Sequence, residues 1–235
     1  MKFLKILIPI SILSLVFIFD YYNKYYKPNT SFDDESIFLY VIKDDSLAFR
    51  DSISKYIKSE KTFYKVARRL KYMENKKTGR FKINKDLGNN DIVNSLKFNN
   101  TPVNVTFNNQ ERIEDLAGRV SKQIYEDSLS LISAFKDQEF LKKNDLNEKN
   151  VLSIFIPNSY NIFWNTTSED FRDRMLEEYK KFWNKERTKK AEELGLSKLD
   201  IISLASIVQI ESRRNDERPS CLLYTSDAAD DVISV

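Results

Sequence analysis

An almost wholly apolar stretch lies near the end of the chain, between residues 201 and 210. This stretch reads IISLASIVQI and contains only two serines and one glutamine among its apolar side chains. Ser197 and Asp200 stand three residues apart just before it, which is the spacing of a capping box at a helix start. The pattern predicts a helix that is apolar on all sides and therefore buried.

A single carboxylate, Glu211, follows this apolar stretch. Helical spacing places Glu211 on the same stripe as Leu204 and Val208, which precede it by seven and three residues. We therefore expect the carboxylate at the edge of a packed face, where a general acid can hold its proton until it is needed. The alternative is that Glu211 is only the first exposed residue where a core helix reaches the surface.

The first half of the chain contains a strand, helix, helix, strand pattern between residues 36 and 84. The β-branched and aromatic run at 36–42 predicts one strand, and the alternating segment that begins at Gly79 predicts the other. Between them, periodic apolar residues predict a helix over 47–57 and a second helix that is capped by Thr62. This order is that of a LysM module, which binds N-acetylated glycan chains, and also that of other small α/β units.

The middle of the chain carries shorter patterns of the same two kinds. They predict a helix at 91–97, a strand at 102–107, and helices at 111–125 and 127–136. Their apolar faces are explained by packing alone. We therefore expect no chemical role for these elements.

A continuous apolar run, VLSIFIP at 151–157, has the length of a buried strand. Residues 157–160 predict a turn after it. A long helix is then predicted from a cap at Thr167 or Ser168 to Leu194, with Gly195 as its C-terminal stop. Its many neighbouring lysines and glutamates indicate a solvated face.

Three aromatic residues, Tyr160, Phe163 and Trp164, follow that apolar run. Aromatic rings can stack on the faces of pyranose sugars, so these side chains are candidates for the floor of a sugar-binding groove. A place in the hydrophobic core is the alternative for each of them. The pattern alone favours the core.

The N-terminus combines Lys2 and Lys5 with an uncharged, mostly apolar run at 6–19 and four tyrosines just beyond it. The run alone has the length of a signal-peptide core. Together with its flanking apolar residues and tyrosines it approaches the roughly 20 residues that a bilayer requires. No small-residue cleavage site follows, which favours an uncleaved signal anchor. A polar segment that starts at Pro28 then predicts a linker.

Composition excludes several classes of chemistry. The chain has no histidine, which removes Ser-His-Asp and Cys-His catalysis and every histidine-ligated metal site. Its four glycines are too scattered for a P-loop or a dinucleotide fingerprint, and its single cysteine permits no internal disulfide. The net charge of +3 does not indicate nucleic-acid binding. We expect neither a cofactor nor a metal, and chemistry carried by carboxylates, tyrosines, lysines or hydroxyls.

Two motifs give the chain a family resemblance. LASIVQIESRRNDERP, from Leu204 to Pro219, resembles the signature of the MltG/YceG-like endolytic murein transglycosylases, and the segment that begins FIPNSYNIFWNTTSED resembles the family's sequence before its catalytic helix. Where the family has two acidic residues two positions apart, this chain has Gln209 and Glu211. Glu211 is therefore the remaining candidate of that pair, and Ser212 after it gives the Glu-Ser pair of other lytic transglycosylases.

The resemblance implies a function. It implies lytic cleavage of the β-1,4 bond between MurNAc and GlcNAc in peptidoglycan strands, which would leave 1,6-anhydroMurNAc ends and terminate nascent glycan chains. Glu211 would be the catalytic residue, and Tyr160, Asn158 and Glu217 would bind substrate. The implied partners are glycan strands, the inner membrane and peptidoglycan synthases, with the catalytic part on the periplasmic side. The alternative is a membrane-anchored glycan-binding or scaffold protein without catalysis.

The resemblance also implies an α+β fold and a domain order. We expect a signal anchor at 1–26, a linker at 27–35, a LysM-like subdomain at 36–98 and a partial mixed α/β catalytic domain at 99–219. The remaining segment, 220–235, matches nothing in the family, and no lysine or arginine occurs after Arg218. We expect this tail to be non-native and the native protein to be longer.

Overall fold

A computed structural model describes the backbone of residues 2–211 and the side chains of residues 9–211. Glu217 and the segment 220–235, for which the sequence made predictions, lie outside the described residues. Over the described residues the fold is α+β, with helices and two small sheets. The chain divides into two compact units, which are Met1–Asn104 with Asn161–Asn165, and Val105–Tyr160 with Thr166–Val235.

The N-terminal helix α1 (Lys2–Tyr25) belongs to the first unit. The side-chain amide of Asn89 donates a hydrogen bond to the Lys24 carbonyl oxygen at 2.7 Å, which fixes the C-terminal end of the helix. None of the helices among residues 2–211 combines the length and the apolar character needed to cross a bilayer. The signal anchor expected over residues 1–26 stays a prediction.

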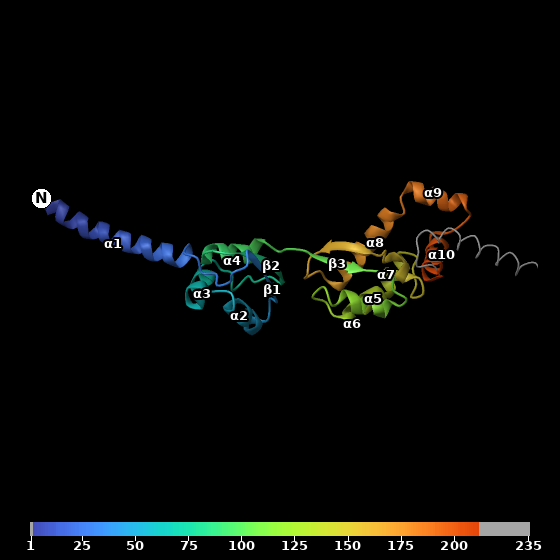
Figure 1. The fold of residues 1–235 in the computed structure, drawn as a ribbon, viewed down its shortest axis with the longest axis horizontal. Helices are drawn as coiled ribbons and strands as arrows, with labels where there is room; N and C mark the ends of the chain where they lie inside the picture. The colour runs from blue at the N-terminus through green and yellow to red at the C-terminus, as the bar shows by residue number, and fades with distance from the viewer. Residues whose placement is uncertain (1, 212–235) are drawn as a thin grey trace, which may run out of the picture. The chain divides into compact units, whose positions relative to one another are not determined.

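The first unit has the strand, helix, helix, strand order that the sequence predicts. Its elements are β1 (Ser36–Val41), α2 (Ser46–Ser54), α3 (Glu60–Arg69), β2 (Gly79–Asn84) and α4 (Asn89–Phe98). In Figure 1 the two strands lie beside each other; they pair antiparallel, with Ser36 opposite Asn84 and Val41 opposite Gly79. The βααβ order is therefore confirmed, and α4 completes the unit.

Side-chain alternation explains the core of this unit. Leu39 and Val41 on β1 and Phe81 on β2 are buried, whereas their neighbours on the opposite face are partly exposed. The apolar stripes of α2, α3 and α4 complete the core. The second helix begins one turn earlier than predicted, because the Ser59 hydroxyl, not Thr62, is the cap and accepts the Thr62 backbone N–H at 3.4 Å.

The segment 27–35 is part of the first unit and not a free linker. The side chain of Asn29 is buried and donates to the Asn89 side-chain oxygen at 2.7 Å. It also accepts the Ser59 backbone N–H at 2.8 Å. Composition indicated a linker because such a buried polar network is invisible in a local sequence pattern.

The second unit is mainly helical. Its elements are β3 (Val103–Phe107), α5 (Ile113–Val120), α6 (Ser128–Phe135), α7 (Gln138–Lys143), a 3₁₀ turn η1 (Val151–Ile154), β4 (Asn158–Ile162), α8 (Ser168–Phe182), α9 (Lys185–Glu193) and α10 (Lys198–Glu211). Strands β3 and β4 pair in a two-stranded sheet. The predicted strand at 102–107 and helices within 111–125 and 127–136 are confirmed.

The strand predicted at 151–157 is wrong. These residues form the 3₁₀ turn η1, and β4 follows at 158–162, where a turn was predicted. The side-chain oxygen of Asn147 accepts the backbone N–H groups of Lys149 and Asn150, which starts a helical turn just before the apolar run. A short apolar run fits a buried helical turn as well as a strand.

The long helix predicted from Thr167 to Leu194 is two helices. Thr167 caps the first as expected, but α8 ends at Phe182. The side-chain oxygen of Asn184 then accepts the Arg187 backbone N–H at 2.9 Å and caps α9 as a new helix. Gly195 ends α9 with φ +66, a left-handed conformation that glycine adopts without strain.

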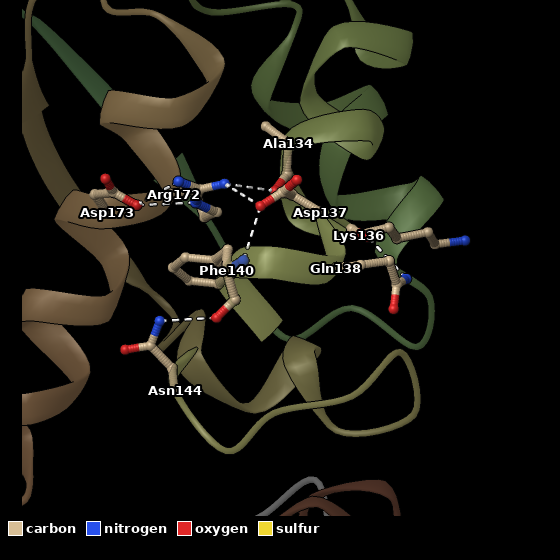
Figure 2. A network of polar contacts seen from close by, with 8 residues as sticks. All are labelled: Ala134, Lys136, Asp137, Gln138, Phe140, Asn144, Arg172 and Asp173. Carbon is tan, nitrogen blue, oxygen red and sulfur yellow. Dashed lines mark hydrogen bonds and ion pairs between the residues drawn. The ribbon is translucent and has the colours of Figure 1, made fainter. Parts of the chain in front are cut away.

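One arginine, Arg172 on α8, links three helices of the second unit (Figure 2). Its guanidinium donates to the Ala134 carbonyl oxygen at 3.0 Å at the end of α6, and it lies 3.9 Å from the centre of the Phe140 ring on α7. It also pairs with Asp173 at 2.8 Å, and its closest approach to Asp137 is 3.8 Å. Asp137 itself caps α7 by accepting the Phe140 backbone N–H. Arg172 therefore holds the ends of α6 and α7 against α8.

Candidate functional site

The helix that carries Glu211 begins with the predicted capping box. The backbone N–H of Ser197 donates to the Asp200 carboxylate at 2.8 Å, and the backbone N–H of Asp200 donates to the Ser197 hydroxyl at 3.1 Å. Hydrogen bonds from Ser197 hold the pKa of Asp200 below its usual value. The start of α10 is thus fixed by local interactions.

The prediction that this helix is buried on all sides is wrong for the described structure. Val208 is buried, but Ile207 and Ile210 are exposed, the latter with 71% of its surface accessible. Among residues 2–211, α9 is the main neighbour of α10. Because the described elements cover one side of the helix, its apolar composition is not matched by burial all round.

Glu211 is the last residue of α10 and is exposed. Leu204 is partly buried and Val208 is buried, so the stripe that leads to Glu211 is on the covered side of the helix, as the spacing predicted. The carboxylate therefore leaves the helix where this covered stripe reaches the solvent. Its catalytic role stays a prediction.

The C-terminal turn of α10 is joined to the loop after β3. The side-chain amide of Asn109 donates a hydrogen bond to the side-chain oxygen of Gln209. Gln209 is the residue that stands where the family signature has its first acidic group. Residues two apart on a helix point to different sides. This contact therefore positions the helix that carries Glu211 and not the Glu211 carboxylate itself.

Tyr160, a candidate for sugar binding, lies in the core. Its ring is stacked on Phe107 with 5.5 Å between the centroids, and its hydroxyl donates to the Ile156 carbonyl oxygen. Burial raises the pKa of Tyr160 to about 12. This placement favours the core alternative, because little of the ring can contact a ligand.

The other substrate-binding candidates are distributed differently. Asn158 is exposed on β4, and its side-chain oxygen accepts the Ser159 backbone N–H at 2.8 Å. Phe163 is exposed, and Trp164 packs edge to face against Tyr40 of the first unit. Glu217 lies outside the described residues. The substrate-binding roles of Asn158 and Glu217 stay predictions.

Sequence reasoning missed a groove over α5. The groove is shallow and has a volume of about 680 Å³. The one signal for it in the sequence is the helix predicted over 111–125, on which Glu114, Gly118 and Lys122 recur at intervals of four residues. The groove is lined by Thr106, Gln110, Glu114, Asp115, Gly118, Arg119, Lys122 and Gln123.

Comparison with known proteins identifies the family. The sequence model of the YceG-like family matches residues 49–221, which is most of the chain and includes Glu211. The chain belongs to the YceG-like family. A YceG-like protein from Listeria monocytogenes, known from its crystal structure, is similar at 18% identity with a TM-score of 0.48, over 79% of this chain and 67% of that chain. A search of curated proteins found no match.

Membership of the YceG-like family confirms the resemblance that the two sequence motifs carried. It assigns the chain to the family of murein transglycosylases as a whole. In this YceG-like protein the family match begins in α2, runs through the second unit and includes the groove over α5. The roles of individual residues are not fixed by the match.

Proposed function

We propose that this YceG-like protein is an endolytic lytic transglycosylase that cleaves the β-1,4 bond between MurNAc and GlcNAc in peptidoglycan strands. The observation that carries the proposal is the family match over residues 49–221, which includes the helix that ends at Glu211. The exposed end of α10 supports it, because a carboxylate there is accessible to a polymer.

The mechanism needs one protein carboxylate. Glu211 protonates the leaving glycosidic oxygen as the bond to C1 of MurNAc breaks. As a carboxylate, it then accepts the proton of the C6 hydroxyl of the same sugar while that oxygen bonds to C1. The product is a 1,6-anhydro end and Glu211 regains its proton. A hydrolase would normally need a second carboxylate, whereas here the nucleophile belongs to the substrate.

The proposal extends to location and partners. The protein is anchored by residues 1–26 in the inner membrane, with the catalytic part in the periplasm, where it terminates nascent glycan strands beside peptidoglycan synthases. The apolar side chains of α1, which are exposed from Ile10 to Phe19, support an anchoring role for this helix. Separation of membranes from soluble protein, with and without residues 1–26, tests this part.

The experiment for the activity is digestion of purified peptidoglycan followed by mass spectrometry of the released fragments. The full-length protein should release anhydro-ended fragments, and its Glu211→Gln variant should release none while giving an unchanged circular dichroism spectrum. Glu192→Gln is the matched control, because Glu192 is also an exposed glutamate near a helix end. Activity that survives in Glu211→Gln would refute the residue assignment, and reducing ends in place of anhydro ends would refute the lytic mechanism.

The βααβ order of the first unit favours a second candidate function, which is glycan binding without cleavage. This order, with its antiparallel strand pair, is the one expected for a LysM-like module. Binding to insoluble peptidoglycan in a pull-down, with no fragments released, would support this scaffold function over catalysis.

A further inference from the structure

The groove over α5 lies on the face of the helix that does not contribute to the core. Leu116, Ala117 and Val120 are buried beneath it. On the groove side, an ideal Cβ built at Gly118 would have no other atom within 4 Å, so the missing side chain leaves an open notch in the middle of the helix. A volume of about 680 Å³ is typical of ligand sites, which are roughly 300–1,000 Å³.

One wall of the groove is held rigidly. The side-chain amide of Gln123 pairs with the backbone of Thr106 on β3, accepting its N–H at 2.9 Å and donating to its carbonyl oxygen at 3.0 Å. The Thr106 hydroxyl contacts the Ser159 hydroxyl of β4 at 2.7 Å. These bonds connect the end of the α5 segment to both strands, so the wall is preorganised before any ligand arrives.

The groove presents charged groups of both signs that have no ion-pair partner within residues 9–211. Among the described residues, the Arg119 side chain makes one hydrogen bond, from Nε to the Thr106 carbonyl oxygen at 3.4 Å, and the side chains of Lys122 and Asp115 make none. Glu114 differs, because Lys136 pairs with it at 2.7 Å and lowers its pKa. Two cations and one carboxylate are therefore available to a ligand.

These features select the class of ligand. No aromatic side chain is among the described residues that line the groove, so it offers no platform for a sugar ring. A polyanion fits the groove poorly, because the unpaired carboxylate of Asp115 would repel it. A short peptide with carboxylates and an amino group satisfies all three charges, because guanidinium and ammonium groups pair with carboxylates and Asp115 pairs with the amine.

We propose that the groove over α5 binds the peptide stem carried by a glycan strand, with Arg119 and Lys122 on its carboxylates and Asp115 on its amino group. This inference rests on the proposed function, because the strands of that substrate carry such peptides. The loop that contributes Gln110 to the groove also contributes Asn109, which holds Gln209 on α10. The same loop thus connects the peptide site with the helix that carries Glu211.

The test is calorimetric binding of a soluble muramyl pentapeptide, measured in the Glu211→Gln chain so that no cleavage occurs. Gly118→Trp fills the notch and should weaken binding about tenfold or more without lowering the unfolding midpoint. Leu129→Trp, which adds the same ring at an exposed position of α6, should bind as the parent does. The double variant Arg119→Gln, Lys122→Gln should also bind the pentapeptide about tenfold more weakly. The matched control, Lys142→Gln with Lys143→Gln on α7, should keep the parent affinity.

Two ligand controls complete the experiment. A pentapeptide with amidated carboxylates should bind weakly and should not respond to the Arg119 and Lys122 substitutions. Equal binding of the disaccharide without its peptide, or normal binding by a folded Gly118→Trp chain, overturns the proposal. If Gly118→Trp does not fold, the Arg119 and Lys122 pair decides the question. If the protein binds the peptide but does not cleave strands, the proposed function is refuted and this inference is not. If it cleaves strands but the groove variants bind the peptide as the parent does, this inference is refuted and the proposed function is not.

Discussion

Replacement of Arg172 by methionine should destabilise the second unit. The Arg172 side chain is 11% accessible, and its guanidinium lies between the end of α6 and the ring of Phe140 on α7 (Figure 2). Methionine retains much of the apolar stem of arginine but cannot donate a hydrogen bond or interact as a cation. The substitution therefore removes the polar link between the three helices while leaving a small cavity.

The size of the effect follows from the separate contacts. The charged hydrogen bond to the Ala134 carbonyl oxygen contributes about 1.5–3 kcal/mol. The cation over the Phe140 ring adds about 1 kcal/mol. The pair with Asp173, whose carboxylate is more than half exposed, adds less than about 1 kcal/mol. We expect Arg172→Met to lower the free energy of unfolding by about 3 kcal/mol, mostly through the hydrogen bond.

Urea unfolding followed by tryptophan fluorescence measures this effect. A Trp164→Phe background leaves Trp183, next to the end of α8, as the reporter of the second unit. Asp173→Asn is the matched control, because it removes the exposed ion pair alone and should cost less than about 1 kcal/mol. A cost for Arg172→Met no larger than that of Asp173→Asn would refute the reasoning.

Three further predictions concern glycines and a helix cap. Gly88→Ala should destabilise the first unit by about 1–3 kcal/mol in urea unfolding, because its Cβ would lie 2.6 Å from the Tyr26 carbonyl oxygen; an unchanged midpoint would contradict this. Gly118→Ala, whose Cβ meets no atom within 4 Å, should instead stabilise α5 by up to about 1 kcal/mol, and a loss would contradict the open notch. The hydrogen bond from the Ser130 backbone N–H lowers the pKa of Asp127 below 3.8 in the folded chain. The stability that this cap contributes is therefore present above pH 3.8 and is lost as the pH falls through the pKa of the folded state. Asp127→Asn should therefore lose less stability than the parent between pH 7 and acidic pH, and parallel losses would refute the linkage.

The features that were predictable from sequence depend on neighbours along the chain. The βααβ order followed from alternating strands and periodic helices, and the capping box of Ser197 and Asp200 was found where its spacing placed it. Each of these signals is complete within a few residues. No tertiary contact was needed to interpret them.

The predictions that failed depended on contacts between segments or on competing local caps. The apolar run at 151–157 formed a 3₁₀ turn because Asn147 starts a helical turn just before it. Asn184 divided the predicted long helix by capping a new one, a signal that the many helix-forming lysines and glutamates around it concealed. The burial of α10 could not be predicted from its composition, since burial depends on what covers a helix.

In the candidate site, too, the sequence revealed what is local along the chain and not what is assembled from separate segments. Glu211 could be selected from its position after an apolar stripe and from the family motif, because both are contiguous in sequence. The groove over α5 could not, because its lining combines that helix with Thr106 on β3 and with Gln123 beyond the helix end. Gly118 carries no chemical signal of its own, and only the structure shows that its missing side chain opens a notch.

The proposed mechanism uses one carboxylate, and that carboxylate must be held accurately against the reacting bond. The helix α10 that carries Glu211 is covered on only one side by the described residues, so packing restrains it weakly. The capping box at Ser197 fixes the conformation of its first turn, and among the described residues Asn109 holds Gln209 in its last turn against the loop after β3. The second of these comes from the loop that also forms the groove. If the two proposals hold, a peptide stem in the groove orders this loop and, through Asn109, the last turn of α10, so that stem binding and strand cleavage are coupled.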